Sequence, residues 1–311
     1  MSVRHARSSV RAGFALVLLL IVGLLAAACG NERAAAPAGQ AAAASVAPTP
    51  PEPANPDVIL ATTTSTQDSG LLDVLAPMFE KKTGYKVKII AVGTGAALAM
   101  AQRGEADVVL VHAPASEKKL VDEGAAINRV LVMHNDFVVV GPAEDPAKVS
   151  GTKSAREAFA KIAAAQSLFV SRGDNSGTNQ AEIAIWKAAN ATPAGAGWYQ
   201  QTGSGMGQTL GVTAERKGYT LTDRATYLAN KANLGLVILV EGDPLLLNVY
   251  HVMQVNPAKF DKVNAEGAKA FSAFMVAADT QKTIGAFGVD KHGQALFFPD
   301  ADKTDAQLGL P

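Results

Sequence analysis

The fold of this chain is decided by residues 58–111, which run VILATTTSTQDSGLLDVLAPMFEKKTGYKVKIIAVGTGAALAMAQRGEADVVLV. Short apolar runs typical of buried strands alternate here with longer amphipathic stretches typical of helices. The predicted strands are Val58–Ala61, Lys86–Ala91 and Val108–Val111, and the predicted helices between them are Asp68–Thr83 and Ala96–Arg103. Successive strand–helix units predict a parallel sheet with helices on its faces.

The same alternation continues towards the C-terminus. Further apolar runs and amphipathic stretches lie, in order, at Val130–Met133, Phe137–Pro142, Lys153–Gln166, Leu168–Ser171, Gly177–Ala189, Leu234–Val240, Val249–Val255 and Ala265–Ala278. Two crossings, near residues 135–142 and 241–248, predict a cleft between two lobes. We therefore expect an α/β fold in which residues 57–138 and 245–311 form lobe 1 and residues 139–244 form lobe 2.

Residues 1–29 have the layout of a secretory signal peptide. Three arginines stand within the first eleven residues, and an uncharged run from residue 12 to residue 28 ends at Cys29. The string LAAACG at 25–30 resembles a bacterial lipobox, although Ala26 stands where that pattern prefers leucine. We expect an exported protein, periplasmic or at the cell surface, anchored to the membrane through a lipid on Cys29. The alternative is a cysteine lost with a cleaved peptide. Residues 30–56, rich in alanine and proline, are expected to form a tether.

The charge balance argues against a nucleic-acid partner. With the three N-terminal arginines set aside, 25 basic residues stand against 28 acidic ones, a net charge of about −3. A basic surface for nucleic acid is therefore not expected. Cys29 is the only cysteine in the sequence, so no internal disulfide can form.

Three polar loops each follow a predicted strand and precede a predicted helix, the place where open α/β sheets bind ligands. The first, ATTTSTQDSG at 61–70, contains five consecutive hydroxyl side chains, which is more than one helix cap requires. The second is Val92–Gly95, where glycines let the backbone approach a ligand, although such turns are also common for geometric reasons alone. The third, SRGDNSGT at 171–178, combines a guanidinium, hydroxyls and a helix N-terminus; the alternative is a surface pair of Arg172 and Asp174.

Together the three loops suit a tetrahedral dianion. Arg172 supplies one positive charge, and each helix N-terminus contributes about +0.5, so two or three termini balance the ligand without lysines. Charge-assisted hydrogen bonds from such donors are about twice as strong as neutral ones.

Eight strings carry a further signal. They are ATTTSTQDSGLLD at 61–73, AVGTGAAL at 91–98, ADVVLVHAP at 106–114, HNDFVVVGP at 134–142, FVSRGDNSGT at 169–178, GMGQTL at 205–210, YTLTDRATY at 219–227 and ILVEGD at 238–243. In this order they resemble the tungstate-binding proteins of ABC transporters, and the resemblance covers about residues 57–311. That family is similar in fold to the type II periplasmic-binding proteins, whose two α/β lobes close on a ligand.

The resemblance implies a ligand set, and it implies partners. The implied ligand-binding residues are Thr63, Thr64, Ser65, Thr94, Ser171, Arg172, Ser176 and Thr178, with Gly205–Gly207 as a further wall. The implied ligand is tungstate bound as an oxyanion, without a metal ion or cofactor held by the protein. The implied partners are an ABC transporter permease and its ATPase, and we expect a monomer.

Molybdate and phosphate are the alternative ligands. Molybdate shares the shape and charge of tungstate, and RGDNSGT at 172–178 also resembles the loop of phosphate-binding proteins. Those proteins place an acidic acceptor where this chain has His112. Tungstate carries no proton, so its site should present only donors, and His112 can be one; the alternative is a satisfied polar residue near the hinge. We expect Asp174 to orient Arg172 and no acidic group to face the ligand.

An extracytoplasmic hydrolase is the alternative from a different functional class. Serine, histidine and aspartate are present, but no Gly-x-Ser-x-Gly elbow precedes a helix in the right place, and no His/Cys cluster has metal-ligand spacing. We therefore expect a binding protein and not an enzyme. A sensor that uses the same fold is a third possibility.

Overall fold

The three strands predicted from the first part of the chain form a parallel sheet. In the computed structural model, β1 (Asp57–Thr63) pairs in parallel with β2 (Lys86–Val92) and with β3 (Val108–Val111). Beyond these strands the sheet is mixed, because β3 pairs antiparallel with β9 (Leu247–Val255) and β9 pairs antiparallel with β4 (Ala126–Pro142). The parallel prediction is confirmed for the first three strands and for the pair of β5 (Phe169–Ser171) and β6 (Tyr199–Gln201), and it is wrong for the pairs that β4 and β9 make, where the chain leaves and re-enters the lobe.

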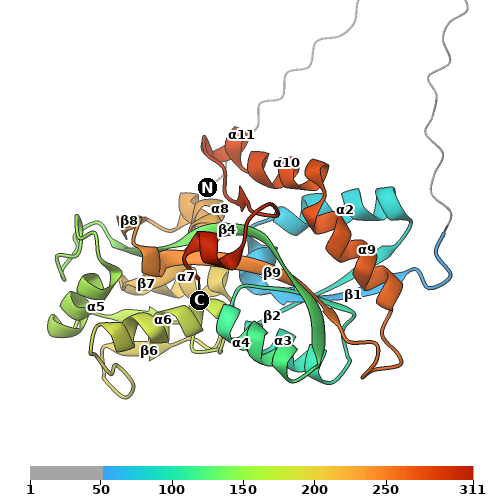
Figure 1. Cartoon of the computed structure of the whole chain (residues 1–311). Helices are drawn as coiled ribbons and strands as arrows, with labels where there is room; N and C mark the ends of the chain where they lie inside the picture. The colour runs from blue at the N-terminus through green and yellow to red at the C-terminus, as the bar shows by residue number, and fades with distance from the viewer. Residues whose placement is uncertain (1–51, 311) are drawn as a thin grey trace, which may run out of the picture. The chain divides into compact units, whose positions relative to one another are not determined.

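The structure describes residues 52–310, and Figure 1 shows the arrangement of their elements. The sheet of lobe 1 ends at the short strand β10 (Phe298–Pro299), which pairs with β4. Around it lie α1 (Thr64–Asp68), α2 (Leu71–Thr83), α3 (Thr94–Gln102), α4 (Pro114–Asp122), α9 (Ala265–Val276), α10 (Ala278–Ala286), α11 (Val289–His292) and η3 (Asp305–Leu308). Lobe 2 contains α5 (Ala155–Ala164), β5 (Phe169–Ser171), α6 (Gly177–Ala188), β6 (Tyr199–Gln201), α7 (Met206–Arg216), β7 (Thr220–Asp223), α8 (Arg224–Asn230), η1 (Lys231–Asn233), β8 (Leu236–Val240) and η2 (Pro244–Leu246). Helices α1, α4, α7, α8, α10 and α11 and strands β6, β7 and β10 were not predicted from the pattern.

Both faces of β3, inside the lobe 1 sheet, are buried, as its unbroken apolar run predicts. Val108 and Leu110 pack into one core cluster with Phe79 of α2. Val109 and Val111 belong to a second cluster on the opposite face, built on α3 and α4. Successive side chains of a strand point to opposite faces, so the apolar side chains of β3 enter the core on both sides of the sheet.

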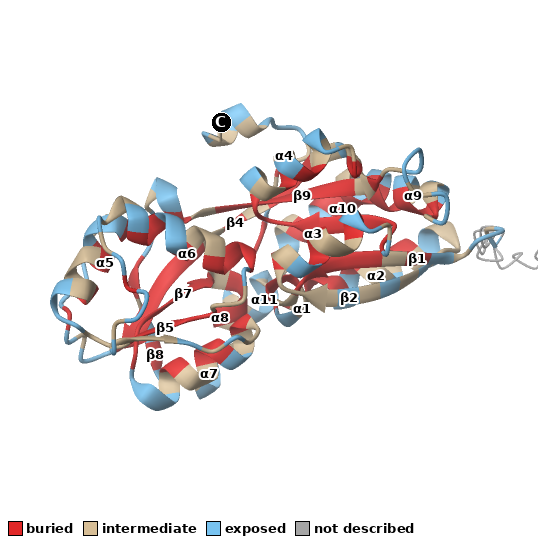
Figure 2. Ribbon diagram, turned by 90° about the horizontal axis from the view of Figure 1, so that it is seen from below, coloured by how far each residue is buried: buried red, intermediate tan, exposed pale blue. Residues whose placement is uncertain are grey.

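Lobe 2 repeats this arrangement around the second half of β4. Phe137 and Val139 pack into a core cluster that contains Trp186 of α6. Val138 and Val140 pack on the other face against Met206 of α7. Figure 2 shows the strands of both lobes as mostly buried, with exposed residues on the outer faces of the helices.

Two chain crossings join the lobes. The first is β4 itself, which pairs with β9 as far as Asp136 and with β7 from Phe137 onwards. The second crossing connects the end of β8 at Val240 to the start of β9 at Leu247. The predicted fold class, two α/β lobes with two hinge crossings, is confirmed. The exact lobe boundaries, at 138/139 and 244/245, stay a prediction.

The predictions for the N-terminal segment lie outside the described residues. These are the signal peptide over residues 1–29, the lipid on Cys29 and all but the end of the tether. Within residues 52–310, no helix is long and apolar enough to cross a bilayer.

Candidate functional site

The three polar loops predicted from the sequence meet between the lobes. The backbone N–H of Gly177 donates to Thr94 Oγ1 at 2.7 Å, and the N–H of Gly95 donates to the carbonyl of Asn175 at 3.1 Å. The starts of α3 and α6 are therefore in direct contact across the lobe boundary. Arg172 makes a third link, since its Nη2 donates to Thr64 Oγ1 at 2.9 Å.

Arg172 is buried and only partly satisfied. Its side chain is 1% exposed, and Nη2 also donates to Asp174 Oδ2 at 2.6 Å, as predicted for Asp174. Nε and Nη1 have no hydrogen-bond partner among residues 52–310. Buried polar atoms are nearly always paired, so two unpaired guanidinium nitrogens indicate a place for an acceptor that the chain does not supply.

The remaining residues of the third loop divide into free and occupied groups. The hydroxyl of Thr178 is buried and, like the two nitrogens of Arg172, has no partner in the described part of the chain. Ser176 caps α6, because its Oγ accepts from the N–H of Asn179 at 3.1 Å. Ser171 is turned away, donating to Glu182 Oε2 at 2.7 Å. The hydroxyl of Thr178 is thus free to bond to a ligand, whereas the hydroxyl of Ser171 is already bonded to Glu182.

Glu182 was missed by the sequence analysis. Its buried carboxylate also accepts from Trp186 Nε1 at 3.0 Å and from the Tyr199 hydroxyl at 2.7 Å. Burial raises the pKa of Glu182, and the hydrogen bond from Ser171 is the largest opposing effect. This group fixes the end of β5 against α6, and so positions the backbone from which Arg172 projects.

The first loop is partly helical, which corrects the predicted start of the helix at Asp68. Thr63 caps α1, because its Oγ1 accepts from the N–H of Thr66 at 3.3 Å. Gly70, with a φ of 82°, then separates α1 from α2. Glycine adopts this left-handed conformation without the steric cost that a Cβ would bring, so the chain can end one helix here and start the next. Thr63, Thr64 and Ser65 therefore stand at a helix start.

His112 donates one hydrogen bond and accepts another, both within the protein. The Asn248 amide nitrogen donates to Asn135 Oδ1 at 2.7 Å, which turns Asn248 Oδ1 towards His112 Nδ1 at 2.8 Å. Nδ1 must then carry the proton, so Nε2 accepts from the Ser65 hydroxyl at 3.2 Å. Burial, helped by the charge of Arg172, lowers the pKa of His112 to about 3 and keeps the ring neutral.

Both ring nitrogens of His112 are thus occupied by groups of the protein, and neither is left to donate to a ligand in this arrangement. The ring instead orients Ser65, and it belongs with Asn135, Asn248 and Tyr250 to a polar network on the two hinge strands. Its 4.7 Å ring-to-ring contact with Tyr250 holds it against β9. The alternative of a satisfied polar residue near the hinge describes it better.

Two carboxyl groups are influenced by the charge of Arg172. Asp174 occupies one nitrogen of Arg172, and a second carboxyl, that of Asp223, lies fully buried within the influence of the Arg172 charge. The signal in the sequence was YTLTDRATY at 219–227, where an aspartate ends a strand and precedes a helix. The net positive charge that can act on a ligand is therefore smaller than the sum of the charges of Arg172 and the helix N-termini.

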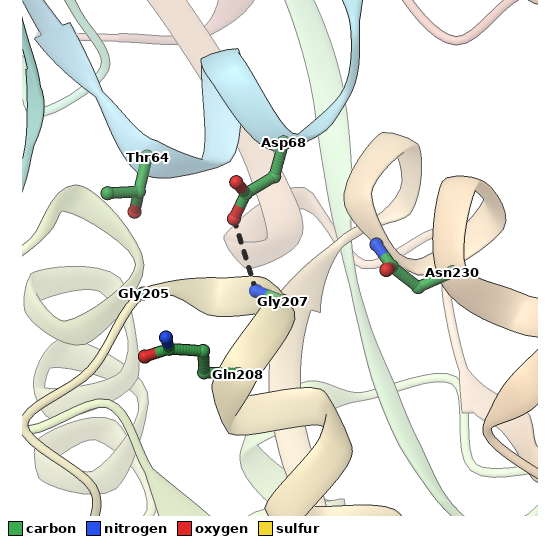
Figure 3. A pocket seen from close by; sticks show the side chains of 6 residues that line it. All are labelled: Thr64, Asp68, Gly205, Gly207, Gln208 and Asn230. Carbon is green, nitrogen blue, oxygen red and sulfur yellow. Dashed lines mark hydrogen bonds between the residues drawn. The ribbon is translucent and has the colours of Figure 1, made fainter.

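A pocket of about 390 Å³ lies at the rim of the site. Figure 3 shows Thr64 and Asp68 of α1 facing Gly205, Gly207 and Gln208 at the start of α7, with Asn230 to one side. Asp68 Oδ2 accepts from the N–H of Gly207 at 3.2 Å, so a carboxylate of lobe 1 caps a helix of lobe 2. We interpret this bond as a latch between the lobes.

Replacing Asp68 by alanine should weaken this latch. The loss of one exposed hydrogen bond of about 0.5–1.5 kcal/mol should speed ligand dissociation by about twofold to tenfold, measured by stopped-flow fluorescence of the tryptophans. Asp68→Asn keeps an acceptor oxygen and removes the charge, so it is the matched control. Equal dissociation rates in the wild type and the alanine variant would show that the bond is not a latch.

The sequence and the fold of this chain are similar to those of known proteins. Residues 41–279 match the model of the PBP superfamily domain. The chain is 49% identical over 248 residues to the tungstate-binding protein TupA of Peptoclostridium acidaminophilum. This match covers 79% of this chain and 86% of that protein. The solved structure of the tungstate-binding protein TupA from Desulfovibrio alaskensis G20 is 49% identical, with a TM-score of 0.67, and covers 79% of this chain and 99% of that one.

A second solved structure agrees with the first. The crystal structure described as the tungstate ABC transporter from Geobacter sulfurreducens is 47% identical, with a TM-score of 0.69, and covers 74% of this chain and 98% of that chain. The resemblance stated from the eight strings is thereby confirmed. The chain belongs to the PBP superfamily and, within it, to the family of these tungstate-binding proteins.

Proposed function

We propose that this protein captures a tetrahedral oxyanion, tungstate, outside the cytoplasm and delivers it to the permease and ATPase of an ABC transporter. One observation carries the proposal. The buried guanidinium of Arg172 keeps two nitrogens without a partner in the described chain, and the buried hydroxyl of Thr178 is likewise unpaired. Donors held ready in a buried site between two lobes suit a ligand that offers only acceptors.

The relatives support the choice of ligand. The two TupA proteins and the Geobacter sulfurreducens structure are named for tungstate. Molybdate remains the closest alternative ligand, since it has the same tetrahedral oxygens and charge. The proposed ligand set is Thr63, Thr64, Ser65, Thr94, Ser171, Arg172, Ser176 and Thr178. The hydroxyl of Ser171 donates to Glu182 in this structure and would have to turn to reach a ligand.

Calorimetric titration tests this function. Tungstate, molybdate, sulfate and phosphate are titrated separately into the mature protein at pH 7, and tungstate and molybdate should bind more tightly than the other two. Phosphate binding as tight as that of tungstate would favour the phosphate alternative. The absence of saturable heat with all four anions would reject oxyanion capture, and hydrolysis of model esters and phosphoesters would then test the hydrolase alternative.

We also propose that the mature protein is a monomer tethered to the membrane through a lipid on Cys29. The support is the charged N-terminus and the apolar run that ends at this cysteine. Cells that process lipoproteins should incorporate labelled palmitate into the wild type and not into the Cys29→Ser variant. Label that persists in the variant, or that is absent from the wild type, would contradict the anchor.

A further inference from the structure

A buried carboxyl group lies at the same edge of lobe 2 as Arg172. The N–H of Val170 donates to the carbonyl of Tyr219, and the N–H of Tyr219 donates to the carbonyl of Leu168, both at 2.8 Å. These bonds set β5 and the start of β7 side by side in parallel. The ends of the two strands therefore carry Arg172 and Asp223 at one edge, the edge where parallel sheets bind ligands.

The pairing of the hinge strands fixes the face that Asp223 occupies. Asp223 lies opposite Phe137 in the antiparallel pair of β7 and β4, so the two side chains share a face of the sheet. The rings of Phe137 and His112 are 6.2 Å apart. On α8, which Asp223 caps, Thr226 Oγ1 donates to the carbonyl of Ser65 at 3.3 Å. The carboxyl group therefore lies among the residues of the first loop and the hinge network.

Asp223 has one occupied oxygen and one free oxygen. Oδ1 accepts from the N–H of Thr226 at 2.8 Å. Oδ2 has no hydrogen-bond partner among residues 52–310, although the side chain is 0% exposed. A buried carboxyl oxygen without a donor is costly when ionised, so it indicates either a protonated group or a ligand contact.

The charges around Asp223 favour protonation. Arg172 is the cation that acts on it, and Asp174 already takes one of the Arg172 nitrogens. His112 is neutral, and the Tyr250 hydroxyl stays protonated because burial raises its pKa. The next residue, Arg224, is bonded to Asp136 and Glu241. Burial raises the pKa of Asp223 itself to about 6.

A dianion placed against Arg172 makes the ionised carboxylate still less favourable, since two anionic groups would share one cation. On the basis of the proposed function, we propose that Asp223 takes up a proton from solvent when the oxyanion binds and that its Oδ2–H then donates a hydrogen bond to an oxygen of the ligand. No other bond forms or breaks. The site thereby gains a donor, loses a negative charge, and selects anions that accept a hydrogen bond at that position.

Proton counting tests this assignment. Titrations of sodium tungstate at micromolar concentration are made between pH 6 and 8 in buffers of different ionisation enthalpy. The wild type should take up about one proton per anion at pH 7.5, and the Kd should rise by about tenfold per pH unit above pH 7. Below pH 6 the free protein already holds the proton, so uptake should decline as the pH approaches 6.

Asp223→Asn is the informative variant. Asparagine is also a good helix cap, and its amide donates without taking up a proton. This variant should bind tungstate with no proton uptake and with a Kd that changes less than twofold between pH 6 and 8. Asp122→Asn, an exposed position on α4, is the matched control and should behave as the wild type. Circular dichroism confirms that each variant is folded.

The outcomes separate this inference from the proposed function. Wild-type binding without proton uptake and with a flat pH profile would overturn the role of Asp223 and leave tungstate capture intact. Full proton uptake retained in Asp223→Asn would also overturn it, because the proton would then go to another group. Failure of the wild type to bind tungstate at any pH would overturn the proposed function itself.

Discussion

Replacement of Arg172 by alanine is expected to weaken tungstate binding by about 2–5 kcal/mol, or about 30- to 5,000-fold in Kd, the usual cost of truncating one partner of a buried charge pair. The guanidinium is the cation of the proposed site, and its two unpaired nitrogens lie in a region from which water is excluded. Its removal also leaves the carboxylate of Asp174 without its partner. Calorimetric titration of wild type and variant at pH 7 measures the effect.

Two further variants sharpen the Arg172 experiment. Arg172→Lys keeps the positive charge and loses the planar fork, so it should recover only part of the lost affinity. Arg216→Ala removes an arginine of lobe 2 that donates to Gln200 near the surface, and it should bind as the wild type does. Wild-type affinity in the folded Arg172→Ala protein would exclude this residue from the site, and melting curves show whether the variant is folded.

Replacement of Gly177 by alanine is expected to hinder closure of the lobes and to weaken tungstate binding by about 5- to 150-fold, because overpacking costs typically 1–3 kcal/mol. A Cβ at this position would lie 2.6 Å from His112 Nδ1 and 2.7 Å from His112 Cε1. Gly177 belongs to lobe 2 and His112 to lobe 1, so the clash arises only when the lobes meet. Each lobe should still fold.

Small-angle scattering and calorimetry test the effect of Gly177→Ala. With tungstate, the wild type should reach a smaller radius of gyration than Gly177→Ala, since closure brings the loops of both lobes together. Gly211→Ala is the matched control, because Gly211 lies on α7 and a Cβ there would meet nothing within 4 Å. An unchanged affinity and radius in Gly177→Ala would show that the contact between the lobes is not needed for binding.

The sequence by itself determined the repeating units of the fold. The strand at Val108–Val111 has the predicted bounds, and β2 extends one residue beyond its prediction. Both follow from local pattern, because the unbroken apolar run of β3 fits a strand buried on both faces, and the alternation of lysine and apolar residues at the start of β2 fits a strand with one solvent-facing side. The sequence also located the three polar loops that meet between the lobes, since each stands directly between a strand and a helix, and strand ends of a parallel sheet meet at one edge.

The tertiary structure alone decided which polar atoms are free. Ser171 and Thr178 are both hydroxyl residues of one loop, and only the packing of α6 shows that Glu182 takes the first and leaves the second. The state of His112 depends on Asn248, which is 136 residues away in the chain. The proposed role of Asp223 depends on its burial and on the nearby charge of Arg172. Hydrogen-bond partners and desolvation are set by groups that the fold brings together, so neither can be derived from the order of residues along a loop.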